Sequence, residues 1–157
     1  MRKGVEGLKI RFEISDTEEI IIRHRAENKN IDAIKTLIES ALREGDTLML
    51  YKDGTEYFIS KNDVLFFESG NGKLYAHTPN DIYSTHYKLF ELENMLPSCF
   101  VRISKSSIAN VLHISSMRRE LVGNGELTFR NCEKTVYFSR AYYRFLQNKL
   151  NEMRFTK

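Results

Sequence analysis

The sequence has few cysteines and no long apolar stretch. Only two cysteines occur, Cys99 and Cys132, and they form no CxxC pair. So few cysteines cannot build a disulfide framework, which makes a reducing compartment the default expectation. No run approaches the roughly 20 apolar residues that span a bilayer, and the N-terminal segment lacks the continuous apolar core of a secretory signal. We therefore expect a globular protein of the cytoplasm.

Motifs that hold metals or cofactors are also missing from the sequence. None of the 4 histidines lies in an HxH or HExxH arrangement, or at a zinc-type spacing from a cysteine. Walker A, GxGxxG and GxSxG motifs do not occur. The glycines at 70 and 72 are not followed by a helix whose N-terminus could cradle a phosphate. The sequence thus predicts neither an enzyme nor a bound metal or cofactor.

Positive charge is concentrated in the last third of the chain. The formal net charge is +3, but residues 98–157 carry +7 and the preceding residues carry −4. A localised basic surface attracts polyanions, chiefly nucleic acid or anionic lipid. The same surplus of lysine and arginine also fits an ordinary solvated face, so charge alone leaves both interpretations open.

The N-terminal part is predicted to form two strands and a helix. Residues 8–14 alternate between apolar and polar side chains, and residues 19–25 are rich in β-branched side chains, which indicates two strands. Apolar residues then recur at helical spacing over residues 31–42. Asn30 precedes this pattern as a candidate cap, and Gly45 follows it where a glycine often closes a helix.

Short strands separated by turns are predicted for the rest of the chain. The dipeptides Asp53-Gly54 and Asn124-Gly125 are typical of tight hairpins. The expected strands are 48–51, 55–59, 64–68, 74–78, 82–84, 100–103, 108–111, 114–117, 121–122, 127–129 and 136–138. A short helix is expected at 89–96, and a terminal helix after Ser139 whose shared face would hold Tyr142, Phe145, Leu146 and Met153. This pattern predicts a mainly β (α+β) domain of antiparallel sheets.

Three segments carry a resemblance to a known family. The first is DVLFFES at 63–69, followed by a polar loop and KLYAH at 73–77. The second is the helix at 89–96, followed by FVRISKSSIAN at 100–110. The third is VYFSR at 136–140, which leads into the terminal helix. In this order the segments resemble the LytTR DNA-binding domain of bacterial transcription regulators.

The resemblance implies a fold and a division of the chain. The fold would be an elongated antiparallel β-sandwich with short helices at its side, and its loops, not a recognition helix, would read successive major grooves at repeated sites. The domain would span 47–152, after a β-β-α extension at 1–46 and before a tail at 153–157. The extension is too short for the receiver domain of a response regulator, so we expect a stand-alone regulator.

The resemblance also implies partners. The first is double-stranded DNA with direct repeats, bound by single copies or by a homodimer that pairs on DNA. A small membrane protein that restrains the regulator is a further family-level expectation. The alternative function from the residues alone is a basic protein-interaction module that docks an acidic partner or an anionic lipid surface.

Candidate DNA-binding residues lie where the predicted strands end. They are Ser69, Asn71, Lys73, Arg102, Ser104, Lys105, Ser106, Ser139, Arg140 and Arg144. Lysine reaches phosphate or guanine, serine donates to phosphate oxygens, and asparagine can read an adenine edge. Two alternatives stay open: Arg102 could instead pair with an acid such as Glu68, and Asn71 could simply form a turn.

Overall fold

The computed structural model describes residues 31–155, without the side chains of residues 37, 39–44, 154 and 155. The chain divides into two units, residues 1–38 and 39–157, and each is considered by itself. Helix α1 (Ile31–Glu44) forms where the apolar spacing predicts it, and Gly45 follows its last residue. The strands predicted at 8–14 and 19–25 lie outside the described residues.

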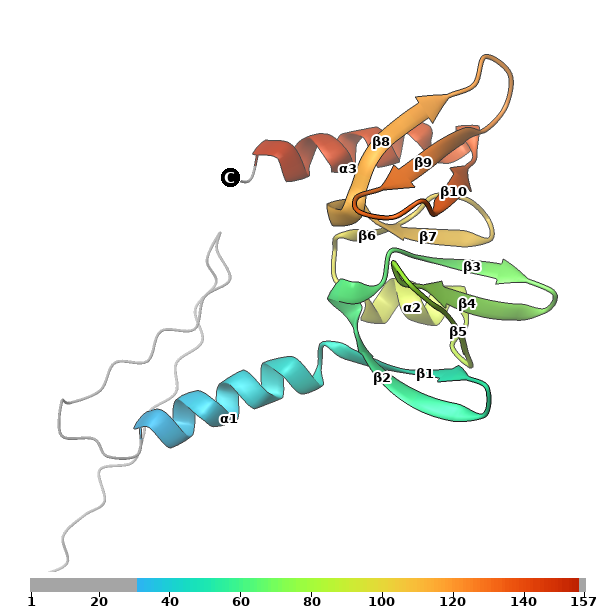
Figure 1. The fold of residues 1–157 in the computed structure, drawn as a ribbon. Coiled ribbons are helices and arrows are strands. Elements are labelled where there is room, and N and C mark those ends of the chain that lie inside the picture. Colours follow the sequence, from blue (N-terminus) through green and yellow to red (C-terminus); the bar gives the residue numbers. More distant parts are fainter. Residues whose placement is uncertain (1–30, 156–157) are drawn as a thin grey trace, which may run out of the picture. The chain divides into compact units, whose positions relative to one another are not determined.

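The second unit consists mainly of antiparallel strands (Figure 1). A 7-stranded sheet has the order β2-β1-β5-β4-β3-β7-β6, and a 3-stranded sheet has the order β10-β9-β8. The strands of the large sheet are β1 (Thr47–Lys52), β2 (Thr55–Ser60), β3 (Phe66–Gly70), β4 (Lys73–His77), β5 (Ile82–Thr85), β6 (Phe100–Arg102) and β7 (Ser107–Asn110). The small sheet holds β8 (Ile114–Arg119), β9 (Gly125–Phe129) and β10 (Thr135–Phe138).

Short helices complete this unit. They are α2 (Leu89–Met95), α3 (Tyr143–Phe155) and the 3₁₀ turns η1 (Lys61–Asp63), η2 (Val111–His113) and η3 (Arg140–Tyr142). The mainly antiparallel β architecture with a few helices confirms the predicted fold class. None of the helices among residues 31–155 is long and apolar enough to cross a bilayer.

Strand β3 lies between two apolar cores. Phe66 and Phe67 are consecutive, so they point to opposite faces of the sheet. Phe66 stacks on Phe129 of the small sheet with a centroid distance of 5.3 Å, and both belong to the core that α3 also lines through Leu146. Phe67 packs in the second core, which includes Leu92 of α2. Burying each phenylalanine contributes about 1.5–3 kcal/mol, so this strand fixes the two sheets against each other.

Two hairpins of the large sheet have two-residue turns with positive φ. Asp53 and Gly54 join β1 to β2 at φ values of 51° and 76°. Asn71 and Gly72 join β3 to β4 at 52° and 74°. Positive φ at both positions matches the right-handed twist of the flanking strands, and Asn-Gly and Asp-Gly tolerate it best. The polar segment 69–73 is therefore shorter as a loop than expected, because Ser69, Gly70 and Lys73 belong to strands.

The prediction of a tight turn at Asn124-Gly125 was wrong. Strand β8 runs to Arg119 and pairs directly with β9, so residues 120–124 form the connection. Leu121 and Val122, expected in a strand, lie exposed in that loop. Gly125 is the first residue of β9, where an added Cβ would lie 2.2 Å from Cζ of Phe138. The glycine is thus required by close packing and not by a turn.

The predicted apolar face of the terminal helix was also partly wrong. The 3₁₀ turn η3 precedes α3, so the α-helix begins at Tyr143 and its phase differs from that of a helix capped by Ser139. Its packed residues are Tyr143, Leu146, Leu150 and Met153. Phe145 is 58% exposed, and the Ser139 hydroxyl makes no capping hydrogen bond. The helix continues to Phe155, beyond the expected end of the domain at residue 152.

Candidate nucleic-acid interface

Three segments that hold the candidate residues are joined by backbone hydrogen bonds. The amide of Ser69 in β3 donates to the carbonyl of Ser106 at 2.8 Å. The amide of Ser139, which follows β10, donates to the carbonyl of Ile103 at 2.9 Å. The β6–β7 connection, residues 103–106, therefore lies between the β3–β4 hairpin and the start of η3. We call segments 69–73, 103–106 and 139–144 together the three-segment edge.

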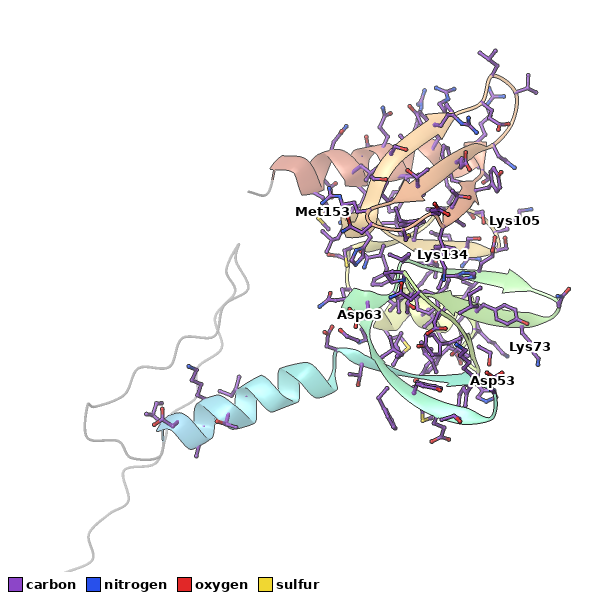
Figure 2. The ribbon with its side chains drawn as sticks, in the orientation of Figure 1. Asp53, Asp63, Lys73, Lys105, Lys134 and Met153 are labelled. Atoms are coloured by element: carbon purple, nitrogen blue, oxygen red, sulfur yellow. The ribbon has the colours of Figure 1, made fainter. Side chains whose placement is uncertain are left out.

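The exposed cations of the three-segment edge have no carboxylate partners. Figure 2 shows Lys73 and Lys105 on the same side of the unit, at the tips of the β3–β4 and β6–β7 connections. Both side chains are exposed, as are those of Arg140 and Arg144. Within residues 31–155, none of the four makes a side-chain hydrogen bond or an ion pair. Unpaired cations on one edge raise the local concentration of polyanions.

Arg102 uses its guanidinium inside the protein. Its Nε donates to the carbonyl of Ser104 at 2.7 Å, and one terminal nitrogen donates to the carbonyl of Lys105 at 2.5 Å. The other terminal nitrogen lies 2.9 Å from a carboxylate oxygen of Glu93 in α2, which replaces Glu68 as the acid considered from the sequence. The side chain is 21% exposed. Arg102 therefore holds the 103–106 connection in shape.

The serines of this connection shape the same turn. Oγ of Ser104 accepts from the amide of Ser106 at 3.1 Å and lies 3.3 Å from its hydroxyl oxygen. The amide of Ile103 donates to the carbonyl of Ser107 at 3.0 Å, which closes the turn. Lys105 stands exposed between the two serines. The turn thus presents one cation with hydroxyl groups on both sides.

Segments 69–73 and 139–144 present the uncharged polar side chains of Ser69, Asn71 and Ser139. Asn71 occupies the left-handed turn position and is exposed, and its turn conformation leaves the amide group available to a ligand. Ser69 is exposed on β3, and Ser139 is partly buried at the start of η3. The turn-forming and base-reading interpretations of Asn71 are therefore compatible.

Arg119 lies at the end of the small sheet from which segment 139–144 leaves, and no pattern in the sequence indicated its role. The guanidinium of Arg119, the last residue of β8, lies 4.4 Å from the ring centroid of Tyr143 in α3. A cation over an aromatic face is stabilised by the ring quadrupole. This contact joins β8 to the first turn of α3, next to Arg140 and Arg144.

Lys134 was likewise missed, and it joins the small sheet to the large one. Its ammonium donates to the carbonyls of Thr78 and Asp81, both at 2.6 Å. The Asp81 carboxylate pairs with Lys52. Figure 2 shows Lys134 between the two sheets. Burial lowers the pKa of Lys134, and this lysine is used for internal contacts instead of ligand binding.

His77 adds no charge near neutral pH. Its ring stacks on Phe66 at a centroid distance of 4.1 Å. Burial, with a smaller effect of the Lys134 ammonium, lowers the pKa of His77 from 6.5 to about 4. Among residues 31–155 there is no cluster of three metal-ligating side chains. Segments 69–73, 103–106 and 139–144 hold no histidine, so the basic character of the three-segment edge comes from lysine and arginine alone.

Comparison with known proteins identifies the family. Residues 54–151 match the LytTr DNA-binding domain. The chain belongs to the LytTR family. This match covers all three segments of the edge, and the LytTR resemblance found from the sequence is confirmed.

Similar proteins support this identification. An HTH-type transcriptional regulator of Staphylococcus aureus strain NCTC 8325 is 31% identical over 138 residues, which cover 87% of this chain and 92% of that protein. A regulator of the same class from strain MRSA252 is 30% identical over 139 residues, with the same coverage. A solved LytTr DNA-binding domain from Bacillus cereus shares the fold with a TM-score of 0.62 and 24% identity, over 67% of this chain and 96% of that one.

The LytTR membership fixes the general function. The chain is a DNA-binding transcription regulator of the LytTR type and not an enzyme. Although the relatives are named as HTH-type regulators, in residues 31–155 helices α1, α2 and α3 are separated from one another by strands. The described part of this LytTR chain therefore holds no helix-turn-helix pair.

Proposed function

We propose that this LytTR protein reads double-stranded DNA with the three-segment edge, whose connecting turns and not a recognition helix enter successive major grooves. The hydrogen bonds that join segments 69–73, 103–106 and 139–144 support this proposal most strongly. They hold three polar turns at one edge, and these turns carry cations that have no internal partner. Such an edge suits a long polyanion with a regular repeat.

The residues of the edge have separate roles in this proposal. Lys105 and Lys73 neutralise phosphates or reach guanine, and Asn71 reads an adenine edge. Ser69, Ser104, Ser106 and Ser139 donate to phosphate oxygens, which sets the register of the protein on the duplex. Arg140 and Arg144 add charge beside the start of α3. Arg102 acts through the 103–106 connection, which it positions.

The site on DNA consists of direct repeats in this proposal. Each copy occupies one repeat in the cytoplasm, and two copies pair when both repeats are filled. A small membrane protein that restrains the regulator remains a family-level prediction.

Selection from random duplexes with the purified full chain tests the proposal. We expect recovery of a repeated motif, and binding to that duplex about 10³-fold or more tighter than to a scrambled duplex of the same length. With roughly five to eight phosphates neutralised, the logarithm of the binding constant should fall with the logarithm of salt at about −0.9 per phosphate. Equal binding to the selected and scrambled duplexes would contradict sequence reading and favour a basic docking module.

A further inference from the structure

The β8–β9 loop leaves the small sheet beside the three-segment edge. Arg119, Gly125 and Phe138 are lateral neighbours in β8, β9 and β10. The loop, residues 120–124, joins the first two of these positions, and Ser139 follows the third. Two strand spacings amount to about 10 Å. The loop therefore starts within about 10 Å of the segment that carries Arg140.

Three contacts fix the base of this loop. The Arg119 guanidinium lies over the Tyr143 ring of α3, as described above. Gly125 packs so closely against Phe138 that no Cβ fits there. Arg118 pairs with Glu126 across the hairpin at 2.7 Å. The loop base is thus held against the start of α3, and in Figure 1 the loop extends toward the side where the β3–β4 and β6–β7 turns end.

The tip of the loop is apolar and uncovered. Leu121 is fully exposed, and Val122 is 89% exposed. The loop contains no lysine or arginine and has one carboxylate, Glu120. Its chemistry therefore does not suit a phosphate contact. Apolar side chains next to a DNA-binding edge suit the sugar and base surface of the minor groove, where such wedges unstack a base step and bend the duplex.

We propose that Leu121 and Val122 form an apolar wedge that enters the minor groove beside the DNA contacted by segment 139–144 and kinks the duplex there. This inference rests on the proposed function, since it needs the duplex to lie on the three-segment edge. The occupant is the bound duplex itself. The wedge contributes shape recognition without counterion release, so it differs from the lysine contacts in its dependence on salt.

The double variant Leu121→Ser with Val122→Ser tests the wedge. The probe is a duplex that carries the motif recovered by selection, labelled at both ends for resonance energy transfer. We expect affinity to fall roughly 10-fold and the end-to-end distance of the bound duplex to increase toward that of straight DNA. The slope of affinity against salt should stay as in the wild type.

Leu112→Ser is the matched control. Leu112 is 48% exposed in η2, which precedes β8 at the other end of that strand. This variant should bind and bend the duplex as the wild type does. Circular dichroism should show both proteins folded.

Several outcomes would overturn the wedge. Unchanged affinity and unchanged bending in a folded double variant would do so, and so would an effect of equal size from Leu112→Ser. Loss of binding to phosphatidylglycerol vesicles with unchanged DNA bending would assign the loop to lipid instead. If the wild type selects no motif, both the proposed function and the wedge are contradicted. If the wild type binds its motif selectively but the double variant keeps its affinity and bending, only the wedge is contradicted.

Discussion

Arg102 and Lys105, two basic residues at the β6–β7 connection, have different tasks. The Arg102 guanidinium donates hydrogen bonds to two backbone carbonyls and pairs with the Glu93 carboxylate. Lys105 projects from the turn that Arg102 holds and makes no ion pair within residues 31–155. Because a cation that is already paired inside the protein releases fewer counterions from DNA, Lys105 should contribute more than Arg102 to the salt-dependent part of binding.

Lys105→Ala should weaken binding to the selected duplex by about 1–3 kcal/mol and reduce the salt slope by about one phosphate. Fluorescence anisotropy at several salt concentrations measures both quantities. Lys149→Ala, which removes the same charge from a lysine paired with Glu152 on α3, should leave them unchanged. Equal binding by Lys105→Ala and the wild type would exclude Lys105 from the interface.

Arg102→Lys should weaken binding through the shape of the turn. A lysine ammonium cannot reproduce the planar fork that reaches two carbonyls and a carboxylate. We expect about 10-fold lower affinity with a nearly unchanged salt slope, because the charge is kept. Glu93→Gln, which leaves the carbonyl contacts in place, should have a smaller effect in the same anisotropy titration. Arg102→Gln, which removes the charge, should also leave the salt slope nearly unchanged, and a slope that falls as in Lys105→Ala would instead make Arg102 a direct phosphate contact.

Protonation of His77 should link stability to pH. Its pKa in the folded protein is about 4, below the unfolded value of 6.5. The unfolded chain therefore binds this proton first as pH falls, and the free energy of unfolding decreases from about pH 6.5 downward. Urea titrations at pH 7 and pH 5 should show this loss, and His77→Gln should reduce it. The variant His86→Gln, at an exposed position, should lose as much stability between pH 7 and pH 5 as the wild type does. An equally large loss in His77→Gln would contradict the assignment of this pH dependence to His77.

At the scale of elements, local sequence signals predicted the β1–β2 hairpin and α2 well. Asp53-Gly54 marks a turn because few other dipeptides accept positive φ at both positions. The start of α3 was not predicted, since an initial 3₁₀ turn shifts which residues share its buried face. The role of Gly125 depends on Phe138, 13 positions away in a neighbouring strand, and no local pattern reveals such a contact.

Gly125→Ala should destabilise the small sheet. The new Cβ would lie 2.2 Å from a Phe138 ring carbon and 2.6 Å from the Arg118 carbonyl oxygen. Because the carbonyl belongs to backbone, relief requires the strands to move, at a cost of about 1–3 kcal/mol. Gly70→Ala is the control, as its Cβ would meet nothing nearer than 3.9 Å. The midpoint of thermal unfolding should be lower for Gly125→Ala than for Gly70→Ala, and equal midpoints would contradict the close packing of Gly125 against Phe138.

At the scale of the whole second unit, long-range pairings decide the site. The sequence predicted most strands, but not that β5 would lie beside β1 or β3 beside β7. The family resemblance located the candidate DNA-binding residues, yet it indicated neither Glu93 as the partner of Arg102 nor Lys134 as the contact between the sheets. Glu93 and Arg102 belong to different elements, and Lys134 lies more than 50 positions from its partners, so these contacts follow from the assembled fold and not from any local pattern.

If the three turns form one surface for one duplex, photo-cross-linking should place all three on the same stretch of DNA. A photoreactive amino acid is placed singly at Lys73, Lys105 or Arg140, and as a control at Phe58, which is exposed on β2. Each protein is irradiated with the selected duplex, and the cross-linked bases are mapped. We expect positions 73, 105 and 140 to react with the same repeat, in that order or its reverse along the DNA, and position 58 to remain unreacted. Cross-links from only one of the three turns, or from position 58 alone, would contradict the account.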